Sequence, residues 1–526
     1  MSAIITDQLR IVRAKQFVAS ASSSTYYSFI GLPNPTDVNS NWNVSPPAPK
    51  DSFEQEFDYW DSMIALKKIY PNDVRQVIRK IKWEEGITYD MYRHDISRTN
   101  TAKPSNATSL YSSNYYVVNS NYQVYICLNN GTSPNNPFGR PSQVEPTFTD
   151  LEPRTVGSGS DGYIWKYLFT LSAVDILRFD STNFIPIPSN WGEDTQTSLI
   201  KNNATNNGQI KICVIKNRGN YSNVSGIRNR VFTNVPIKGD GTGALATITF
   251  NNNAEVENIF VTNGGQDYTF GRVDIASGGL PVPLTNPEFD VIIPPKGGHG
   301  YDVSNELGAF YVSLYSRIEN DNNNPDFITG NEIARIGIVE NPEKYNSSEI
   351  LVDDKVSAVS AIKLIGITNS TDYQATTFSP DSYITQTIGT GTTAVAKVVS
   401  YDKNTGVLKY WQDKSLVGFN TDGSQSDPIY GFNLNKFTSS PSTGGSLVIN
   451  GGSIDLQIDV AFGSTESPGI TTVINNRTYR LGQFFVNGLA NPEVKKHSGN
   501  IIYVDHRPAI TRSQNQKEDI KVILQF

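Results

Sequence analysis

Hydrophobic and polar residues alternate with a period of two along much of this chain, and such alternation predicts half-buried β-strands. Alternation is seen at residues 77–83, after the first pair, and at 520–526, and we also interpret 115–118, 122–128, 163–169, 310–315 and 334–339 as strands. The run at 520–526 alternates up to Phe526, so we expect it to be paired in a sheet rather than frayed. The pattern therefore predicts a mainly β protein.

One segment follows the helical period instead. Phe53, Phe57, Trp60 and Ile64 are spaced i, i+4, i+7 and i+11, which places them on one face of a helix over residues 53–66. Ser52, with Asp51 before it, can cap the start of this helix, acidic residues follow, and Lys67 and Lys68 lie near its end. Pro71 should stop it. A second short helix is predicted at residues 6–17.

Two regions differ in composition from the rest. Residues 197–296 are rich in Asn, Gly, Thr and Val, and a Gly-rich turn precedes an alternating strand at 241–249 and again at 391–399. Each strand is followed by a turn of hairpin type, at 251–253 and at 402–406. We therefore interpret 197–296 and 356–472 as two inserted β-hairpin-rich modules. The remaining segments, 1–196, 297–355 and 473–526, would form a multi-domain, β-sandwich-like core with one or two helices near its N-terminus.

Composition narrows the possible functions. The 526 residues carry a formal net charge of −7, only 18% are charged, and 11% are aromatic. An acidic chain is a poor general binder of nucleic acid. Neither a membrane-spanning apolar run nor an apolar leader is seen in the sequence. Cys127 and Cys213 cannot form a disulfide framework, which fits assembly in a reducing cytoplasm.

The sequence motifs that could indicate catalysis or ligand binding match their patterns only in part. Residues 157–162 match G-x-G-x-x-G, but a strand follows them instead of the helix that a dinucleotide site requires, so we interpret them as a turn. Residues 321–332 resemble a calcium loop in part, but Pro325 and Asp326 break the pattern, which favours a solvated loop. None of the histidines, His94, His299, His497 and His506, has metal-ligand spacing to another His or to a Cys. We expect no catalytic residue, metal or cofactor.

Two blocks resemble a known family. Residues 161–169, D-G-Y-I-W-K-Y-L-F, and the C-terminal block that begins H-S-G at 497–499 are similar to the baseplate wedge protein encoded by gene eight of T-even-like contractile-tailed bacteriophages. Weaker matches occur in the same order at the Trp60 helix, at 77–83, at 125–128 and at 336–342. His506 stands where the family usually has Asn. The two modules make this chain longer than the compact family form, as in the versions associated with cyanobacterial phages.

The resemblance assigns structural, family-motif roles to twelve residues. They are Trp60, Trp83, Asp161, Gly162, Tyr163, Trp165, His497, Ser498, Gly499, Tyr503, Arg507 and Pro508.

The resemblance also implies a function. It implies a non-enzymatic homodimer in the baseplate wedge of the virion tail, assembled in the host cytoplasm. This subunit would bridge the core helical and the peripheral wedge proteins and help to trigger sheath contraction, without nucleic acid or membrane as partner. Two other functions stay open. A carbohydrate- or receptor-binding tail protein would use Gly-rich β modules with exposed tyrosines, and a glycosidase or peptidase would need a pocket with paired acids or a metal.

Overall fold

The computed structural model describes residues 4–33, 42–206, 209–319, 332–412, 435–463, 471–474, 477–480, 485–511 and 516–526. The chain divides into two compact units. Unit 1 comprises Met1–Val18, Arg75–Ser313 and Val522–Phe526, and unit 2 comprises Ala19–Val74 and Leu314–Lys521. Each unit is thus assembled from segments that are distant in sequence. The fold is mainly β, as the alternating pattern predicts.

The elements lying wholly or partly in unit 1 include five of the helical segments that the structure describes. These are α1 (Asp7–Ser20), η2 (Leu110–Ser112), α3 (Ala173–Phe179), α4 (Thr195–Asn206) and α5 (Val303–Glu306). Its strands are β3 (Val74–Arg79), β4 (Tyr116–Val118), β5 (Gln123–Asn130), β6 (Tyr163–Thr170), β7 (Phe184–Pro186), β8 (Cys213–Asn217), β9 (Val231–Gly239), β10 (Thr242–Phe250), β11 (Val256–Gln266), β12 (Gly271–Val273), β13 (Glu288–Val291), β14 (Tyr311–Glu319) and β27 (Lys517–Gln525).

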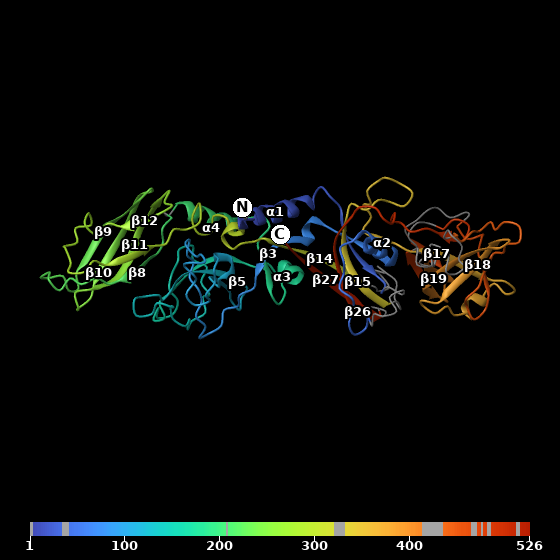
Figure 1. Cartoon of the computed structure of the whole chain (residues 1–526), viewed down its shortest axis with the longest axis horizontal. Helices are drawn as coiled ribbons and strands as arrows, with labels where there is room; N and C mark the ends of the chain where they lie inside the picture. Colours follow the sequence, from blue (N-terminus) through green and yellow to red (C-terminus); the bar gives the residue numbers. More distant parts are fainter. Residues whose placement is uncertain are drawn as a thin grey trace, which may run out of the picture. The chain divides into compact units, whose positions relative to one another are not determined.

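Two hydrophobic cores lie among the described residues of unit 1. The first surrounds the antiparallel sheet β4-β5-β6 and includes Tyr115, Tyr125 and Trp165, none of which is accessible to solvent. The second lies against the sheet β11-β10-β9-β12 and the β8–β13 pair (Figure 1). All of its buried residues fall between Ile210 and Ile293, so residues of the first predicted module build a core among themselves.

Unit 2 holds the remaining elements. Its helical segments are α2 (Phe53–Ser62), η1 (Pro71–Asp73) and η3 (Asp372–Gln374). Its strands, besides parts of β3, β14 and β27, are β1 (Tyr26–Gly31), β2 (Met63–Ile69), β15 (Glu332–Glu340), β16 (Lys355–Ser357), β17 (Ser360–Gly366), β18 (Tyr383–Gly389), β19 (Thr392–Asp402), β20 (Val407–Trp411), β21 (Val448–Ile449), β22 (Leu456–Ile458), β23 (Thr471–Ile474), β24 (Arg477–Arg480), β25 (Leu489–Ala490) and β26 (Asn500–Thr511).

Two sheets dominate unit 2. One has the order β16-β2-β1-β15-β26, with α2 supplying Trp60 to the core beside it. The other follows β18-β19-β20-β17-β22-β21, with β25 added beside β17, and encloses a core whose buried residues run from Ile362 to Ile458. This second core is built by residues of the second predicted module, which is the same relation as in unit 1.

The predicted strands are confirmed with small shifts of their ends. Runs 122–128, 163–169 and 334–339 become β5, β6 and β15, and the C-terminal run becomes β27, which pairs with β14. The two predicted hairpins are also confirmed, because β10 pairs with β11 and β19 pairs with β20, both antiparallel. Residues 157–162 form turns before β6, as expected.

The helix predicted at 53–66 is wrong in length and in its buried face. Ser52 caps α2 through a 3.3 Å hydrogen bond from the Gln55 amide, as predicted, but α2 ends at Ser62. Ile64 lies in β2, and Phe53 is 85% exposed. The reason is the apolar run Met63–Leu66, which is buried throughout and pairs as an inner strand between β1 and β16.

Helices α3 and α4 have no counterpart among the sequence predictions, and α4 spans the predicted module boundary at 196/197. The helix predicted at 6–17 is confirmed as α1. The segment with partial resemblance to a calcium loop, residues 321–332, lies outside the described residues except for Glu332.

Candidate functional site

The family-motif residues of unit 1 begin at the turn before β6. The Asp161 carboxylate is buried and accepts hydrogen bonds from the main-chain nitrogens of Gln143 at 3.0 Å and Tyr163 at 3.1 Å. Gly162 has φ +79°, and a Cβ built on it would lie 2.8 Å from Gly131 Cα. The motif needs Gly here because the backbone is left-handed and another chain segment passes at contact distance.

The aromatic residues of this motif pack in the first core. Tyr163 and Trp165 are inaccessible to solvent, and their rings stack with centroids 5.2 Å apart. The Tyr163 hydroxyl accepts a hydrogen bond from the Tyr89 main-chain nitrogen at 2.9 Å. Trp83 is only partly buried, and its Nε1 donates to Ser142 Oγ at 3.1 Å. These contacts give the motif residues of unit 1 a packing role.

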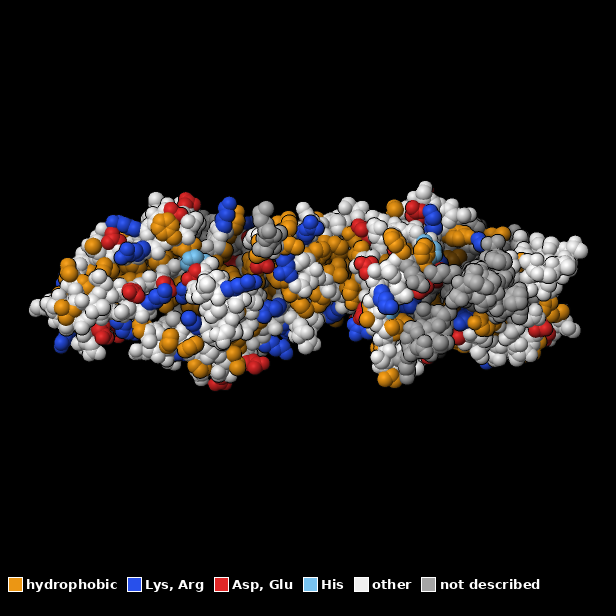
Figure 2. All heavy atoms as spheres, in the orientation of Figure 1, with side chains coloured by type: hydrophobic (Ala, Val, Ile, Leu, Met, Phe, Trp, Pro, Cys, Tyr) orange, Lys and Arg blue, Asp and Glu red, His pale blue; other side chains and the backbone are white. Residues whose placement is uncertain are grey.

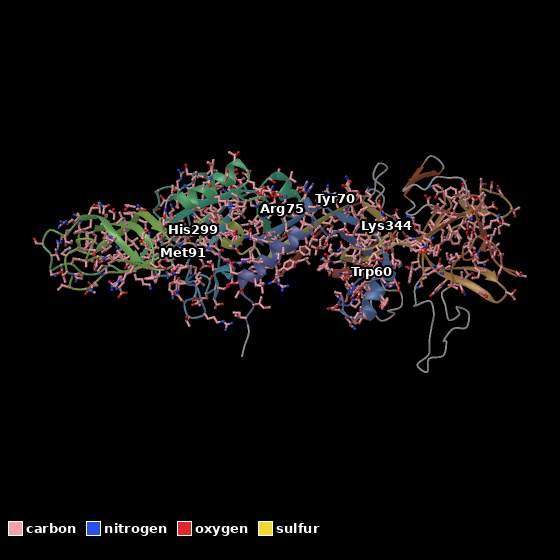
Figure 3. The ribbon with its side chains drawn as sticks, turned by 90° about the horizontal axis from the view of Figure 1, so that it is seen from above. Trp60, Tyr70, Arg75, Met91, His299 and Lys344 are labelled. Atoms are coloured by element: carbon pink, nitrogen blue, oxygen red, sulfur yellow. The ribbon has the colours of Figure 1, made fainter. Side chains whose placement is uncertain are left out.

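The motif residues of unit 2 gather at the end of α2 and the turn before β26. The His497 ring lies 4.8 Å from the Phe57 ring and 6.3 Å from the Trp60 ring, centroid to centroid, and its Nε2 is 3.3 Å from Asp61 Oδ1. Figure 3 labels Trp60 on α2. The structure therefore brings Trp60 and His497 together from positions more than 400 residues apart.

Ser498 and Gly499 shape the same turn. The Ser498 hydroxyl accepts from the Glu343 main-chain nitrogen at 2.9 Å and donates to the Lys495 carbonyl oxygen at 2.5 Å. A Cβ on Gly499, which has φ +72°, would lie 2.4 Å from the Glu340 carbonyl oxygen. The H-S-G sequence thus permits β26 to begin against the end of β15.

Tyr503, Arg507 and Pro508 lie along β26, the edge strand of its sheet. Tyr503 faces Ile338 in register. Between the pairs Arg335–His506 and Ile333–Ile510 the register shifts, and the extra residues of β26 include exposed Arg507 and Pro508. Proline has no backbone N–H to donate, and it is tolerated there because an irregular edge strand does not need a hydrogen bond from every residue. The Arg507 guanidinium pairs with Asp505, Nε to Oδ2, at 2.5 Å.

Sequence reasoning missed a buried arginine that packs among aromatic rings next to these residues. Arg335 is 2% exposed, and its Nη1 donates to the Asp58 carbonyl oxygen at 2.9 Å while its guanidinium lies over the rings of Trp42 and Tyr59. Burial lowers the pKa of Arg335 to about 10. Burial also lowers the pKa of His506, whose Nδ1 is 2.7 Å from the Pro47 carbonyl oxygen. The signal in the sequence was a single arginine inside the apolar run 334–339.

Exposed hydrophobic side chains form a stripe on α1 in unit 1. Ile5, which lies just before the helix, and Leu9 and Val12 on it are 72%, 43% and 45% exposed, and the i, i+3 spacing of Leu9 and Val12 places these two on one side of α1. The opposite side is anchored, because Ile11 and Ala14 are inaccessible to solvent. We call Ile5, Leu9 and Val12 the α1 stripe. On the face seen in Figure 2, charged side chains are scattered and neutral surface predominates.

A cavity of about 1100 Å³ lies within unit 2. Half-buried Tyr345 and the polar residues Asn346 and Ser347 line it on one side. Three lysines also line it, and no Asp or Glu occurs among the described residues that do so. The lysines are Lys436, Lys495 and Lys496. We call it the lysine-lined cavity.

Other buried titratable side chains form small, separate hydrogen-bonded groups. His299 Nδ1 lies 2.6 Å from Glu306 Oε1, and Glu306 Oε2 accepts from the Gly300 nitrogen at 2.7 Å, all in the interior of unit 1. Burial raises the pKa of Cys213 to about 12. Over the described residues, no group of three or more His, Cys, Asp and Glu side chains is placed to hold a metal ion. No helix in the described part of the chain is long and apolar enough to cross a membrane.

Comparison with known proteins gives one family. No curated protein matches the chain. Residues 3–152 match the family model described as bacteriophage T4 Gp8, and this range includes α1, α2, Trp60 and Trp83. The resemblance seen in the sequence is thereby confirmed, and over residues 3–152 the chain matches the Gp8 family of bacteriophage T4.

Proposed function

We propose that this protein is a structural subunit of a phage tail baseplate wedge. It joins neighbouring wedge proteins, supports baseplate assembly and takes part in the change that triggers sheath contraction. The observation that carries the proposal is the match of residues 3–152 to the Gp8 family. The subunit acts in the virion after assembly in the host cytoplasm, as a homodimer and without catalysis.

The α1 stripe supports a role in assembly. It lies within the matched residues, and its three exposed apolar side chains, Ile5 before the helix and Leu9 and Val12 on it, favour contact with another protein over contact with water. An apolar helix side packs well against a second helix. We therefore assign this surface to the core helical wedge proteins.

The proposed domain organisation is a core interrupted by two modules. Segments 1–196, 297–355 and 473–526 supply the core, and 197–296 and 356–472 supply the modules. The clusters from Ile210 to Ile293 and from Ile362 to Ile458 support this division, since each is built by residues of one module. We propose that the modules replace contacts that other subunits make in compact members of the family.

The assembly role is tested by co-expression with the wedge proteins of the same phage. Leu9→Arg combined with Val12→Arg should leave melting temperature unchanged, because both side chains are exposed, but should abolish co-sedimentation with the wedge. Gln8→Arg, at an exposed polar position beside the stripe, is the matched control. Normal co-sedimentation of the double variant, or a baseplate map without this chain, would refute the proposal.

The module role has its own test. Asn217 and Glu288 are paired across β8 and β13, so residues 218–287 can be replaced by a two-residue turn between them. The shortened chain should retain the circular dichroism of a folded β protein and lose part of its affinity for the wedge. Unchanged affinity would count against a contact role for the first module.

A second candidate function is a carbohydrate- or receptor-binding tail protein. The lysine-lined cavity is the observation that favours it, because aromatic, amide, hydroxyl and ammonium groups meet there. A glycan array with the intact chain separates the two functions. Specific glycan binding without any affinity for wedge proteins would make this the better assignment.

A further inference from the structure

We propose that Lys166 and Asn203 react to form an isopeptide bond, a covalent amide between the lysine Nζ and the asparagine Cγ, with Glu152 as the proton carrier. All three residues belong to unit 1. The inference goes beyond the wedge role and does not depend on it. It rests on the contacts among the three side chains, on the burial of two of them and on the chemistry of their groups.

The two reacting side chains meet in the interior of unit 1. Lys166 lies on β6 and Asn203 lies on α4, which packs against β6. Lys166 is 1% exposed and Asn203 is 8% exposed, and Lys166 Nζ is 3.2 Å from Asn203 Oδ1. The amine is thus held next to the carbonyl group whose carbon it would attack. A fixed approach of this kind replaces a chance encounter and greatly raises the rate of a reaction.

Glu152 contacts the other end of the same amide. Asn203 Nδ2 donates a hydrogen bond to Glu152 Oε1 at 2.8 Å, and Lys211 Nζ donates to Glu152 Oε2 at 3.0 Å. The carboxylate accepts from the amide nitrogen while Oδ1 accepts from Lys166, so both contacts agree on which way the Asn203 amide points. A proton acceptor therefore touches the nitrogen that would leave.

The burial of Lys166 favours the neutral amine, which is the nucleophilic form. Burial has the largest effect and lowers the pKa of Lys166 to about 8, with Lys211 acting in the same direction and the carboxylates of Glu152 and Glu306 acting against it. At pH 7 about one tenth of the molecules therefore carry the free amine at this position. The bond should form slowly at neutral pH and faster as the pH rises.

The reaction balances without a further reactant. Neutral Lys166 Nζ attacks Asn203 Cγ, which gives a tetrahedral carbon bonded to both nitrogens. The Glu152 carboxylate, in contact with Nδ2, then lies close to both of them, takes one proton from Nζ and passes it to Nδ2. The Cγ–Nδ2 bond breaks, ammonia leaves, and an amide joins β6 to α4. The linked nitrogen no longer titrates, so the lowered pKa belongs to the unlinked chain.

Mass spectrometry of the full chain tests the proposal. Protein freshly purified at neutral pH and protein stored at about pH 9 are digested with trypsin, which does not cleave after a lysine whose amine is part of an amide. We expect a fragment in which residues 155–178 are joined to residues 202–211, lighter than the two peptides together by one ammonia. It should increase with pH and be absent from protein stored in urea. Complete cleavage after Lys166 at about pH 9, or equal linkage in urea, would overturn the proposal.

Variants assign the role of each residue. Lys166→Met and Asn203→Ala should abolish the linked fragment. Glu152→Gln, at a side chain that is 51% exposed, should leave the circular dichroism unchanged and reduce the linked fragment at least tenfold, because an amide does not take up the proton. Asn202→Ala, at the exposed position next to Asn203 on α4, is the matched control and should link as the unaltered chain does. Unchanged linkage in Glu152→Gln, or its loss in Asn202→Ala, would overturn the mechanism.

Discussion

Lys166 Nζ donates a hydrogen bond to the Leu151 carbonyl oxygen at 2.6 Å, although Lys166 is only 1% exposed in the core of unit 1. Its second acceptor is Asn203 Oδ1, at 3.2 Å. Burial lowers the pKa of Lys166 to about 8. A charged ammonium is therefore held in the interior at neutral pH by neutral oxygens.

This predicts a stability that rises with pH. Between pH 8 and about 10.4, the ordinary lysine pKa, the unfolded chain holds a proton at this position that the folded chain has released. The free energy of unfolding should therefore rise by about 2 kcal/mol from pH 7 to pH 9.5, relative to Lys166→Met. Urea denaturation of both proteins at the two pH values measures it. If the difference in free energy of unfolding between the two unlinked proteins stays constant with pH, the lowered pKa of Lys166 is contradicted.

Trp165→Ala should be among the most destabilising substitutions in unit 1. Trp165 is inaccessible to solvent and stacks on Tyr163, so removal of its ring leaves a large cavity and should cost about 3–5 kcal/mol. Trp83→Ala is the comparison, because Trp83 is only partly buried, and it should cost clearly less. Chemical denaturation of both variants ranks them, and a reversed order would show that Trp165 is not a core residue.

Comparison of Gly162→Ala with Gly86→Ala should separate the stability cost of a steric clash from that of backbone strain. Both Gly162 (φ +79°) and Gly86 (φ +82°) are left-handed, so alanine strains either position by about 1–2 kcal/mol. Only at Gly162 does the added Cβ meet another backbone atom, whereas at Gly86 nothing lies within 4 Å. We expect Gly162→Ala to lower stability by at least about 1 kcal/mol more than Gly86→Ala. Equal losses in thermal unfolding would mean that Gly131 moves away freely.

Val522→Asp should disrupt the C-terminal strand. Val522 is 4% exposed in β27, so the substitution buries an unpaired carboxylate and should cost about 3 kcal/mol or more. Gln525→Asp, at an exposed position of the same strand, should stay within about 0.5 kcal/mol. Gel filtration and melting temperature distinguish the two variants. Similar behaviour of both would indicate that β27 contributes little to the fold.

Local pattern was sufficient to find most strands but not the end of α2. Strands β5, β6 and β15 were predicted from the sequence pattern, although each buries three or more consecutive residues and therefore both of its faces. The run after Trp60 fits a helix and a buried strand equally well in sequence. The run forms a strand because Met63–Ile69 pairs with Tyr26–Gly31, which lies more than 30 residues earlier in the chain.

The sequence indicated only part of the candidate functional site, because its contacts join segments that are distant in the chain. Family resemblance pointed to His497 and Trp60, but not to their contact, which joins positions 437 residues apart and depends on the tertiary fold. Arg335 looked like one polar residue in an apolar strand, and its role as the centre of a buried aromatic cluster required Trp42 and Tyr59 from another segment. The lysine-lined cavity likewise draws on separate segments, 345–360, 410–412, 436–437 and 486–496.

The hydrogen bond from Arg10 Nε to the Phe526 backbone oxygen, 2.5 Å long, has a consequence for how the chain folds. It joins positions 516 residues apart, and the rings of Phe17 and Phe526 also contact each other, with centroids 5.3 Å apart. Contacts of such sequence separation require closure of a very long loop, which slows folding. Unit 1 should therefore acquire its last native contacts late, so refolding monitored near Phe526 should lag behind refolding monitored at Trp165.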